Sequence, residues 1–237
     1  MKHIILPDNG KRHLAFYLAM EQFVADKIDD DAFFVWRVDP TVIIGRNQVL
    51  ENEVNIEYCQ CHGISVVRRK SGGGCVYSDD GNIMISSISR RGNASDIFES
   101  YLSQMVEALN SIGLPAERSG RNDILIEGRK VSGNAFRQLP TRSVVHGTLL
   151  YSSDLDALER AVKPPVEKLQ RHGVASVRQR VMNIQEYIEG KSDIHVALQS
   201  VQTLESFLTE RFCDGEIMLT EAEVNAIERL ASEYQLE

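Results

Sequence analysis

Three consecutive glycines, at positions 72–74, constrain the fold of this chain more than any other feature of its sequence. They lie between apolar segments, and glycine loses more backbone entropy on folding than any other residue. Such a run is useful where a ligand must approach the backbone closely, because successive amide N–H groups can point at one phosphate or carboxylate. The run therefore predicts an anion-binding loop, with a tight glycine turn as the alternative.

Two arginines, Arg68 and Arg69, precede the glycines. A guanidinium group suits phosphate oxygens. Side chains alternate along a strand, however, so at most one of the two should reach the site. Two better-known phosphate loops are excluded, because the segment lacks a Gly-Lys-Ser/Thr ending and no G-x-G-x-x-G pattern enters a helix.

A second polar segment surrounds Lys130. A lysine at a hairpin end is usually just exposed, but Lys130 is soon followed by Ser132 and Gly133, past which a ligand can approach the backbone. Asp123 opens the preceding strand, where it could orient a cation or bind a metal-linked phosphate. His146 lies in an apolar strand, where a hydrogen-bonded core histidine is the ordinary interpretation. Together with the glycines, these residues predict a site for an anionic ligand that carries phosphate.

The cysteines suggest one alternative. Cys75 follows the glycines directly and could form a nucleophile–base pair with His146. Cys59, Cys61 and His62 resemble half of a zinc site, but no second Cys/His pair lies near them at zinc-like spacing. We interpret these three as ordinary helix residues, and the metal ligands, if any, are unknown from the sequence.

Hydrophobic periodicity and turn residues predict an α+β fold with a mixed, mainly antiparallel sheet flanked by helices. Strands dominate the first two thirds of the chain and helices the last third. The predicted strands are 32–38, 41–45, 64–67, 83–88, 123–126, 131–136 and 144–151, with a hairpin turn at 127–130. The predicted helices are 11–28, 54–63, 96–112, 154–162, 194–212 and 220–234, with a break at Pro164 and Pro165.

Composition excludes several classes of protein. The chain has 237 residues, of which 43% are hydrophobic, so its core needs no disulfide or metal for stability. Its 26 basic and 34 acidic residues argue against a large nucleic-acid footprint, although a local basic patch is possible. No apolar run approaches the ~20 residues that span a bilayer, and the apolar stretch near the N-terminus is too short for a signal peptide. Four cysteines make no disulfide framework. We therefore expect a cytoplasmic protein that binds neither membrane nor nucleic acid.

Four motifs together resemble the lipoate–protein ligase family: RRKSGGGCVYSDDGN, GRKVSGNAFR, HGTLL and SVRQRVMNI. The match runs from about residue 14 to residue 188, in the family's order and spacing. It implies the fold shared by lipoyl and biotinyl ligases, which is similar to that of class II synthetases. A catalytic domain over 1–190 and a helical extension over 191–237, packed on the same domain, are expected. The arginine–glycine loop of biotin ligases is not found, which favours the lipoyl branch.

The resemblance implies that the protein joins lipoate or octanoate to ATP, giving acyl-AMP and pyrophosphate. The acyl group would then pass to a lysine of a lipoyl acceptor domain, of the 2-oxoacid dehydrogenase E2 or glycine-cleavage H-protein type. Mg²⁺ is expected because pyrophosphate is the leaving group. The sequence does not separate lipoate from octanoate, since an apolar tunnel discriminates by only ~0.8 kcal/mol per methylene.

The resemblance also implies roles for single residues. Lys130 would be catalytic, contacting both the acyl carbonyl and the phosphate. The nucleotide would be held by Arg69, Gly72, Gly73, Gly74, Cys75, Val76, Tyr77, Asp123 and Lys130. The acyl group would be bound by Trp36, Val67, Lys130, Ser132, Gly133 and His146.

Three departures from the family pattern bear on the activity. Ser78 stands where histidine is frequent, Cys75 stands where alanine is common, and the sequence ends at Glu237, where longer ligases continue into an accessory domain. We therefore expect this chain alone to make acyl-AMP slowly and to transfer the acyl group from preformed lipoyl-AMP well. A separately encoded accessory domain is a possible partner for the first step.

Two other functions compete with the ligase. One is an ATP-independent octanoyl or lipoyl transferase that uses a cysteine or a lysine. The compared transferases carry their nucleophilic cysteine elsewhere than Cys75, and the segment 90–113 of this chain contains none, which favours the ligase. The other is a non-catalytic lipoyl-binding or carrier-docking protein. The presence of Lys130 together with the whole glycine run argues against this last function.

Overall fold

A computed structural model describes residues 1–8, 10–90, 92–120, 122–163 and 180–234. Its larger sheet has the strand order β11-β1-β2-β6-β10-β9-β8-β7. The bounds are β1 (Lys2–Ile5), β2 (Ala32–Trp36), β6 (Asn82–Arg90), β7 (Ala116–Ser119), β8 (Asp123–Ile126), β9 (Arg129–Gln138), β10 (Arg142–Leu150) and β11 (Gly215–Met218). Strand β1 pairs in parallel with β2 and β11, whereas the other neighbours are antiparallel. The predicted α+β fold with a mixed, mainly antiparallel sheet is confirmed.

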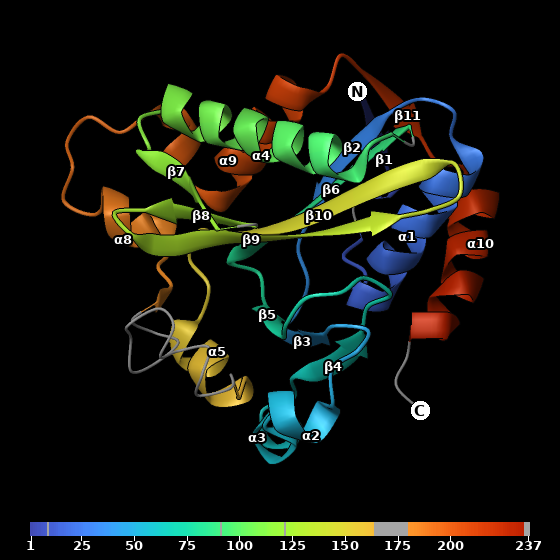
Figure 1. The fold of residues 1–237 in the computed structure, drawn as a ribbon, viewed down its shortest axis with the longest axis horizontal. Coiled ribbons are helices and arrows are strands. Elements are labelled where there is room, and N and C mark those ends of the chain that lie inside the picture. Colours follow the sequence, from blue (N-terminus) through green and yellow to red (C-terminus); the bar gives the residue numbers. More distant parts are fainter. Residues whose placement is uncertain (9, 91, 121, 164–179, 235–237) are drawn as a thin grey trace.

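Helices cover both faces of this sheet (Figure 1). The longer ones are α1 (Leu14–Lys27), α4 (Ala94–Ser111), α9 (Val201–Phe212) and α10 (Glu221–Ala231). The shorter ones are α2 (Leu50–Glu53), α3 (Ile56–Cys61), α5 (Leu155–Ala161), α8 (Ile184–Ile188), η1 (Val196–Leu198) and η2 (Ser232–Tyr234). Helices α1 and α10 share one hydrophobic core with the sheet, and α4 and α9 share a second core on its opposite face. None of the helices that the structure describes is both long and apolar enough to cross a bilayer.

A second, smaller sheet carries the glycines. Its order is β4 (Ser65–Arg68), β3 (Thr41–Ile44), β5 (Val76–Ser78), with β3 parallel to β4 and antiparallel to β5. Residues 69–75, the glycine loop, join β4 to β5. This sheet is inserted between β2 and β6, which are neighbours in the larger sheet. Both connections between the sheets therefore run side by side, and the small sheet lies below the large one beside α2, α3 and α5 (Figure 1).

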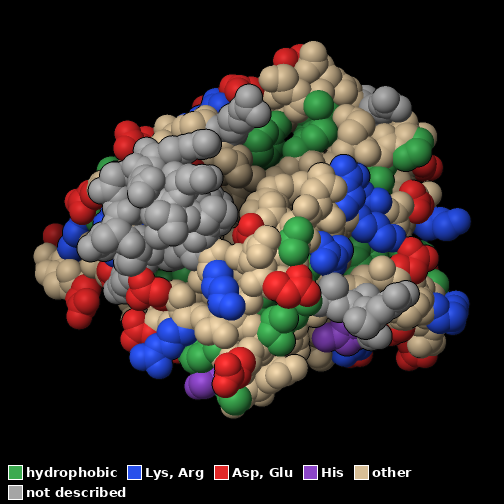
Figure 2. Space-filling view, turned by 60° about the horizontal axis from the view of Figure 1, so that its bottom comes forward, with side chains coloured by type: hydrophobic (Ala, Val, Ile, Leu, Met, Phe, Trp, Pro, Cys, Tyr) green, Lys and Arg blue, Asp and Glu red, His purple; other side chains and the backbone are tan. Residues whose placement is uncertain are grey.

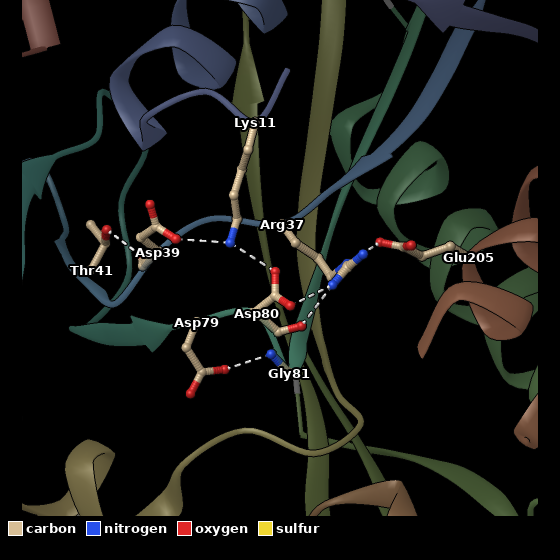
Figure 3. A network of polar contacts seen from close by, with 8 residues as sticks. All are labelled: Lys11, Arg37, Asp39, Thr41, Asp79, Asp80, Gly81 and Glu205. Carbon is tan, nitrogen blue, oxygen red and sulfur yellow. Dashed lines mark hydrogen bonds and ion pairs between the residues drawn. The ribbon is translucent and has the colours of Figure 1, made fainter. Parts of the chain in front are cut away.

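Ion pairs fasten the junction of the two sheets (Figure 3). The guanidinium of Arg37, which follows β2, lies 2.8 Å from Asp80 in the β5–β6 turn and 2.8 Å from Glu205 of α9. The ammonium of Lys11 lies 2.8 Å from both Asp39 and Asp80. These contacts join both connections to α9 and to the segment before α1, so they fix how the small sheet sits against the large one.

The predicted amphipathic helix over 11–28 forms as α1, but it is not amphipathic. Every residue from 14 to 21 is buried, including the carboxyl-bearing Glu21. The helix lies between the sheet and α10, so core residues surround most of its circumference.

The turn predicted at 127–130 is shorter in the structure. Only Glu127 and Gly128 lie between β8 and β9, and both have positive φ, at 50° and 74°. Positive φ at both central residues is typical of the tight hairpin turn that matches strand twist. Strand β9 therefore begins at Arg129, and Lys130 is a strand residue and not a turn residue.

Four short strands, β1, β5, β7 and β11, lie outside the predicted strand ranges. Each has three or four residues, too few for alternation to be visible in the sequence. Strand β11 lies in the segment expected to be only helical, and it forms one edge of the large sheet beside β1. The boundary at residue 190 stays a prediction, and the predicted break at Pro164 and Pro165 lies outside the described residues.

Arg37→Met should lower the free energy of unfolding by about 2 kcal/mol, because the Glu205 carboxylate would stay mostly buried without its cation. The side chains of Arg37 and Glu205 are each 18% exposed. Urea unfolding at neutral pH measures the effect. Lys11→Met is the matched control: the lysine side chain is 39% exposed and its acidic partners more so, so its loss should cost less than about 1 kcal/mol. Equal effects of the two substitutions would contradict the role given to Arg37.

Candidate functional site

A cavity, partly open to solvent, lies between the two sheets. Ten of the residues predicted for the site line it: Trp36, Arg69, Gly73, Gly74, Cys75, Val76, Asp123, Lys130, Gly133 and His146. Four predicted residues are not among the lining residues: Val67 and Tyr77 are buried in cores, Ser132 is 1% exposed, and Gly72 lies within the glycine loop. The cavity therefore brings together the glycine loop, Lys130 and His146, as the sequence predicts.

One side of the cavity is an apolar wall made of Leu18, Trp36, Ile43, Val76 and Met84. Sequence reasoning missed Leu18, Ile43 and Met84. Two of these stand opposite predicted residues in the sheets, since Met84 pairs with Trp36 and Ile43 pairs with Val76. Knowledge of strand pairing would have found them, whereas the local sequence gives no such signal.

The glycine loop is organised by Arg69. Its side chain is 6% exposed, and its guanidinium donates hydrogen bonds to the carbonyls of Ile43 (3.2 Å), Gly72 (2.8 and 3.2 Å) and Gly74 (2.7 Å). In a planar trans peptide the N–H points away from the preceding C=O. The N–H groups of Gly73 and Cys75 therefore point away from Arg69. Both residues line the cavity, so we expect these two backbone donors to face a ligand bound there.

Backbone conformation explains Gly73, and the close approach of two backbone segments explains Gly45. Gly73 has φ 96°, a conformation that side-chain-bearing residues rarely adopt. A Cβ on Gly45 would collide with the carbonyl of Gly73. The loop after β3 and the glycine loop thus pack backbone against backbone.

The opposite side of the cavity carries positive charge. The ammonium of Lys130 lies 2.7 Å from one oxygen of Asp123, and the guanidinium of Arg180 lies 2.7 Å from the other. Burial alone would raise the pKa of Asp123, but the charges and hydrogen bonds of Lys130 and Arg180 outweigh burial and lower it. Two cations share one carboxylate, so the cluster has a net charge of +1. Figure 2 shows Lys and Arg side chains gathered on part of one face of the molecule, although the net charge of the whole chain is −8.

The backbone of Lys130 is held by the segment that follows Arg180. The Met182 N–H donates to the Lys130 carbonyl at 2.9 Å, and Arg129 donates to the Val181 carbonyl at 2.8 Å. A Cβ on Gly133 would come within 2.5 Å of the Lys130 ammonium, so glycine lets the lysine lie across its own strand. Arg180 belongs to the SVRQRVMNI motif, whose first four residues lie outside the described residues, and the sequence analysis gave it no role.

The nucleophile–base pair of Cys75 and His146 is not supported. The two nitrogens of His146 lie 2.7 Å from the hydroxyl of Ser71 and 3.1 Å from the carboxylate of Glu21. Among the described residues no hydrogen bond joins the imidazole to Cys75. Burial, together with the charge of Glu53, raises the pKa of the Cys75 thiol to about 12. A thiol with such a pKa is protonated at neutral pH and is a poor nucleophile.

A metal site built by side chains is not found in the described part of the chain. Within the residues that the structure describes, no group of three or more His, Cys, Asp or Glu lies close enough together to hold an ion. In the cavity, both oxygens of Asp123 are already engaged by cations.

Comparisons with known proteins point in one direction. The family model described as "Lipoyl protein ligase A/B catalytic domain" matches residues 13–207. Lipoate–protein ligase 1 of Staphylococcus aureus is 38% identical over 91% of this chain and 66% of its own length. A lipoate–protein ligase of Bacillus subtilis is 40% identical over 73% of this chain and 54% of its own length. The chain thus spans between half and two thirds of these relatives.

A solved structure agrees with the sequence relatives. It comes from a study of a bi-partite lipoate protein ligase and its E2 lipoyl domain from Thermoplasma acidophilum. The match has a TM-score of 0.81 at 27% identity, and it covers 98% of this chain and 93% of the other. The whole architecture described above is therefore shared with that protein.

The cluster around Asp123 should make stability depend on pH. Its pKa is lower in the folded chain than the ordinary 3.8, so its contribution is complete above that value and is lost as pH falls below it. Asp123→Asn should cost about 2 kcal/mol at neutral pH, since hydrogen bonds to charged groups contribute on this scale. The difference between the two proteins in urea unfolding should shrink as pH drops below about 4. A difference that stays constant down to strongly acid pH would contradict the ion-pair assignment.

Thiol reactivity tests the environment of Cys75. With a pKa of about 12, only about one Cys75 thiol in ten thousand is ionised at pH 8. Alkylation of the folded protein with iodoacetamide at that pH, followed by peptide mass spectrometry, should label the exposed Cys61 first and Cys75 at least a hundredfold more slowly, on the order set by the thiolate fractions. Rapid labelling of Cys75 would show an activated thiol and reopen the transferase alternative.

Proposed function

Since the chain belongs to the lipoyl protein ligase A/B catalytic-domain family, we propose that it activates lipoate or octanoate with ATP and transfers the acyl group to a lysine of an acceptor protein. The resemblance seen in the four sequence motifs is confirmed by this membership. The relatives are longer than this chain. The complete reaction is therefore a proposal for this chain and is not carried over from them.

One observation carries the proposal: a single cavity offers two kinds of surface. The apolar wall around Trp36 suits a saturated acyl chain. Other parts of the lining offer the backbone of the glycine loop and the cations Lys130 and Arg180. A molecule with an apolar chain that ends in a carboxyl group joined to a phosphate matches both surfaces, and acyl-AMP is such a molecule.

These residues support the first step through charge. A carboxylate oxygen of the acid attacks the α-phosphorus of ATP, the bond to the β-phosphate oxygen breaks, and pyrophosphate leaves. Negative charge accumulates around phosphorus as this happens. Lys130 and the N–H groups of Gly73 and Cys75 stabilise that charge, because they are fixed before the reaction begins. Asp123 holds Lys130 in place at 2.7 Å.

The second step uses the same groups. The amine of the acceptor lysine attacks the acyl carbonyl carbon, the amine loses a proton, and AMP leaves with the former carboxyl–phosphate oxygen. Lys130 is placed to stabilise the oxyanion of the tetrahedral intermediate. The acceptor that we propose is a lipoyl domain, the kind of domain named with the Thermoplasma acidophilum ligase.

Mg²⁺ fits this chain as part of the substrate rather than as a resident ion. Magnesium is commonly bound by one or two carboxylates together with substrate phosphates. The described cavity does not provide a free carboxylate for it, so we propose that Mg²⁺ enters on the triphosphate, and no step above depends on it. The need for a separate accessory domain and the cytoplasmic location stay predictions.

A direct test uses purified protein with lipoate or octanoate and ATP. Pyrophosphate should be released only when acid and nucleotide are both present, and acyl-AMP should be detected by mass spectrometry. Addition of a lipoyl domain should then give a mass increase of one acyl group on its lysine. Acyl transfer from a carrier protein without ATP, and no acyl-AMP, would instead support the transferase.

Lys130→Met should slow acyl transfer by about 10²–10³-fold, the typical effect of removing one preorganised charge donor. The assay is acylation of the lipoyl domain from synthetic lipoyl-AMP, which bypasses the adenylation step. Lys27→Met, which removes an exposed lysine at the end of α1, is the control and should leave the rate unchanged. Near-normal transfer by a folded Lys130→Met protein would remove Lys130 from the catalytic machinery.

A further inference from the structure

A continuous chain of hydrogen bonds runs through the interior from the apolar wall to the glycine loop. The indole N–H of Trp36 donates to the hydroxyl of Ser86 at 2.9 Å, and this hydroxyl donates to the carboxylate of Glu21 at 2.7 Å. The other oxygen of Glu21 lies 3.1 Å from Nδ1 of His146, and Nε2 of His146 lies 2.7 Å from the hydroxyl of Ser71. These five residues come from α1, β2, β6, β10 and the glycine loop.

Burial makes this chain costly to break. Glu21, Ser71 and Trp36 are 4%, 3% and 4% exposed, and Ser86 is not exposed at all. A buried carboxylate without partners is strongly unfavourable, so Glu21 depends on both of its contacts. The same burial strengthens each hydrogen bond, because the surroundings are less polarisable than water.

The donors and acceptors can be assigned along the chain. An indole N–H only donates, so the Ser86 oxygen accepts from Trp36 and its hydrogen goes to Glu21. The Glu21 carboxylate accepts at both oxygens, which places a proton on Nδ1 of His146. With a neutral imidazole the other nitrogen is an acceptor and the Ser71 hydroxyl donates to His146, whereas an imidazolium donates from Nε2 to the Ser71 hydroxyl. In both forms each group of the chain is engaged by its neighbour, so a change at either end alters the next bond.

We infer that Glu21 and His146 are positioning residues that couple the apolar wall at Trp36 to the glycine loop at Ser71. Ser71 directly precedes the glycines, and its carbonyl also accepts from the Arg46 N–H at 3.0 Å. Trp36 and His146 both line the cavity. A fatty acid bound against Trp36 and His146 therefore shifts the glycine loop, whose N–H groups contact the phosphate. By reciprocity, a nucleotide on the loop shifts the wall. The catalytic use of this coupling rests on the proposed function.

The first test needs no ligand. Glu21→Gln keeps the shape of the side chain, but its amide has one acceptor oxygen and a donor nitrogen, so one of the two bonds, to Ser86 or to His146, must be lost or reversed. Hydrogen exchange of two protected amides at the loop, the Arg46 N–H on the Ser71 carbonyl and the Arg69 N–H on the Ile44 carbonyl, should become at least about tenfold faster in this variant when followed by mass spectrometry, as expected when a local anchor is lost. Asp26→Asn removes a carboxylate from an exposed position on the same helix and should change nothing.

Two outcomes of the exchange test would overturn the inference. One is a folded Glu21→Gln protein whose loop exchanges at the unmutated rate. The other is equal acceleration in all peptides, which would reduce Glu21 to a general stabiliser of the core.

The second test uses Trp36, which is the single tryptophan of the chain. ATP added without acid should change its fluorescence in the unmutated protein. Ser71→Ala should remove most of that change while calorimetry still detects bound ATP. A full fluorescence change in Ser71→Ala would mean that the nucleotide acts on Trp36 directly and would contradict the coupling. If calorimetry finds no ATP binding to the unmutated protein, the proposed function fails, and the exchange measurement still decides the coupling.

Discussion

The junction between the two sheets is the constraint on which the rest of the structure depends. The chain leaves the large sheet after β2 and returns to it at β6, and ion pairs of Arg37 and Lys11 with Asp80 hold the two connections together. The glycine loop belongs to the small sheet, whereas Lys130 belongs to the large one. The distance between the loop N–H groups and the ammonium is therefore set by this junction, and neither sheet alone would form the site.

The glycine loop is held by three consecutive side chains that reach different parts of the molecule. Arg69 binds carbonyls of the loop itself and of β3, and Ser71 binds His146 of β10. Between them, Lys70 lies 2.7 Å from the carboxylate of Glu233 and 4.3 Å above the ring of Tyr234, both in η2. The glycines allow the loop backbone many conformations, and the contacts of these three side chains restrict it. The result is a loop with fixed donors, as electrostatic stabilisation of a developing charge requires.

The parts of the site that the sequence predicts are those encoded locally. Three adjacent glycines allow backbone conformations and a close approach of ligand that other residues exclude, and the small residues after Lys130 leave room beside the lysine. The contacts of Arg69 were less visible: the sequence suggests a guanidinium that binds phosphate, whereas in the structure this guanidinium donates to carbonyls of the glycine loop while the residue also lines the cavity. A charge next to a loop can serve either purpose, and only the fold decides which.

The parts that the sequence does not predict depend on contacts between distant segments. Arg180 reaches Asp123 across 57 positions, and Glu21 reaches His146 across 125. Strand β11 is recognisable only beside β1, because four residues with a mixed pattern are not distinctive. Glu21 is buried, although glutamate side chains are mostly exposed in proteins. A buried glutamate is informative, because it marks the place where the chain of hydrogen bonds from Trp36 to Ser71 crosses the hydrophobic core.

The central claim is that one cavity between the sheets binds an acyl chain and an adenylate together. It is tested most directly by calorimetry with a non-reactive acyl-sulfamoyl adenosine, in which both parts are joined, against octanoate and AMP measured separately. The account predicts that the joined molecule binds at least about a thousandfold more tightly than either part, because it meets the apolar wall and the loop at once and loses its translational freedom only once. Affinity no greater than that of the better single part would show that the two surfaces do not act on one ligand, and would contradict the account.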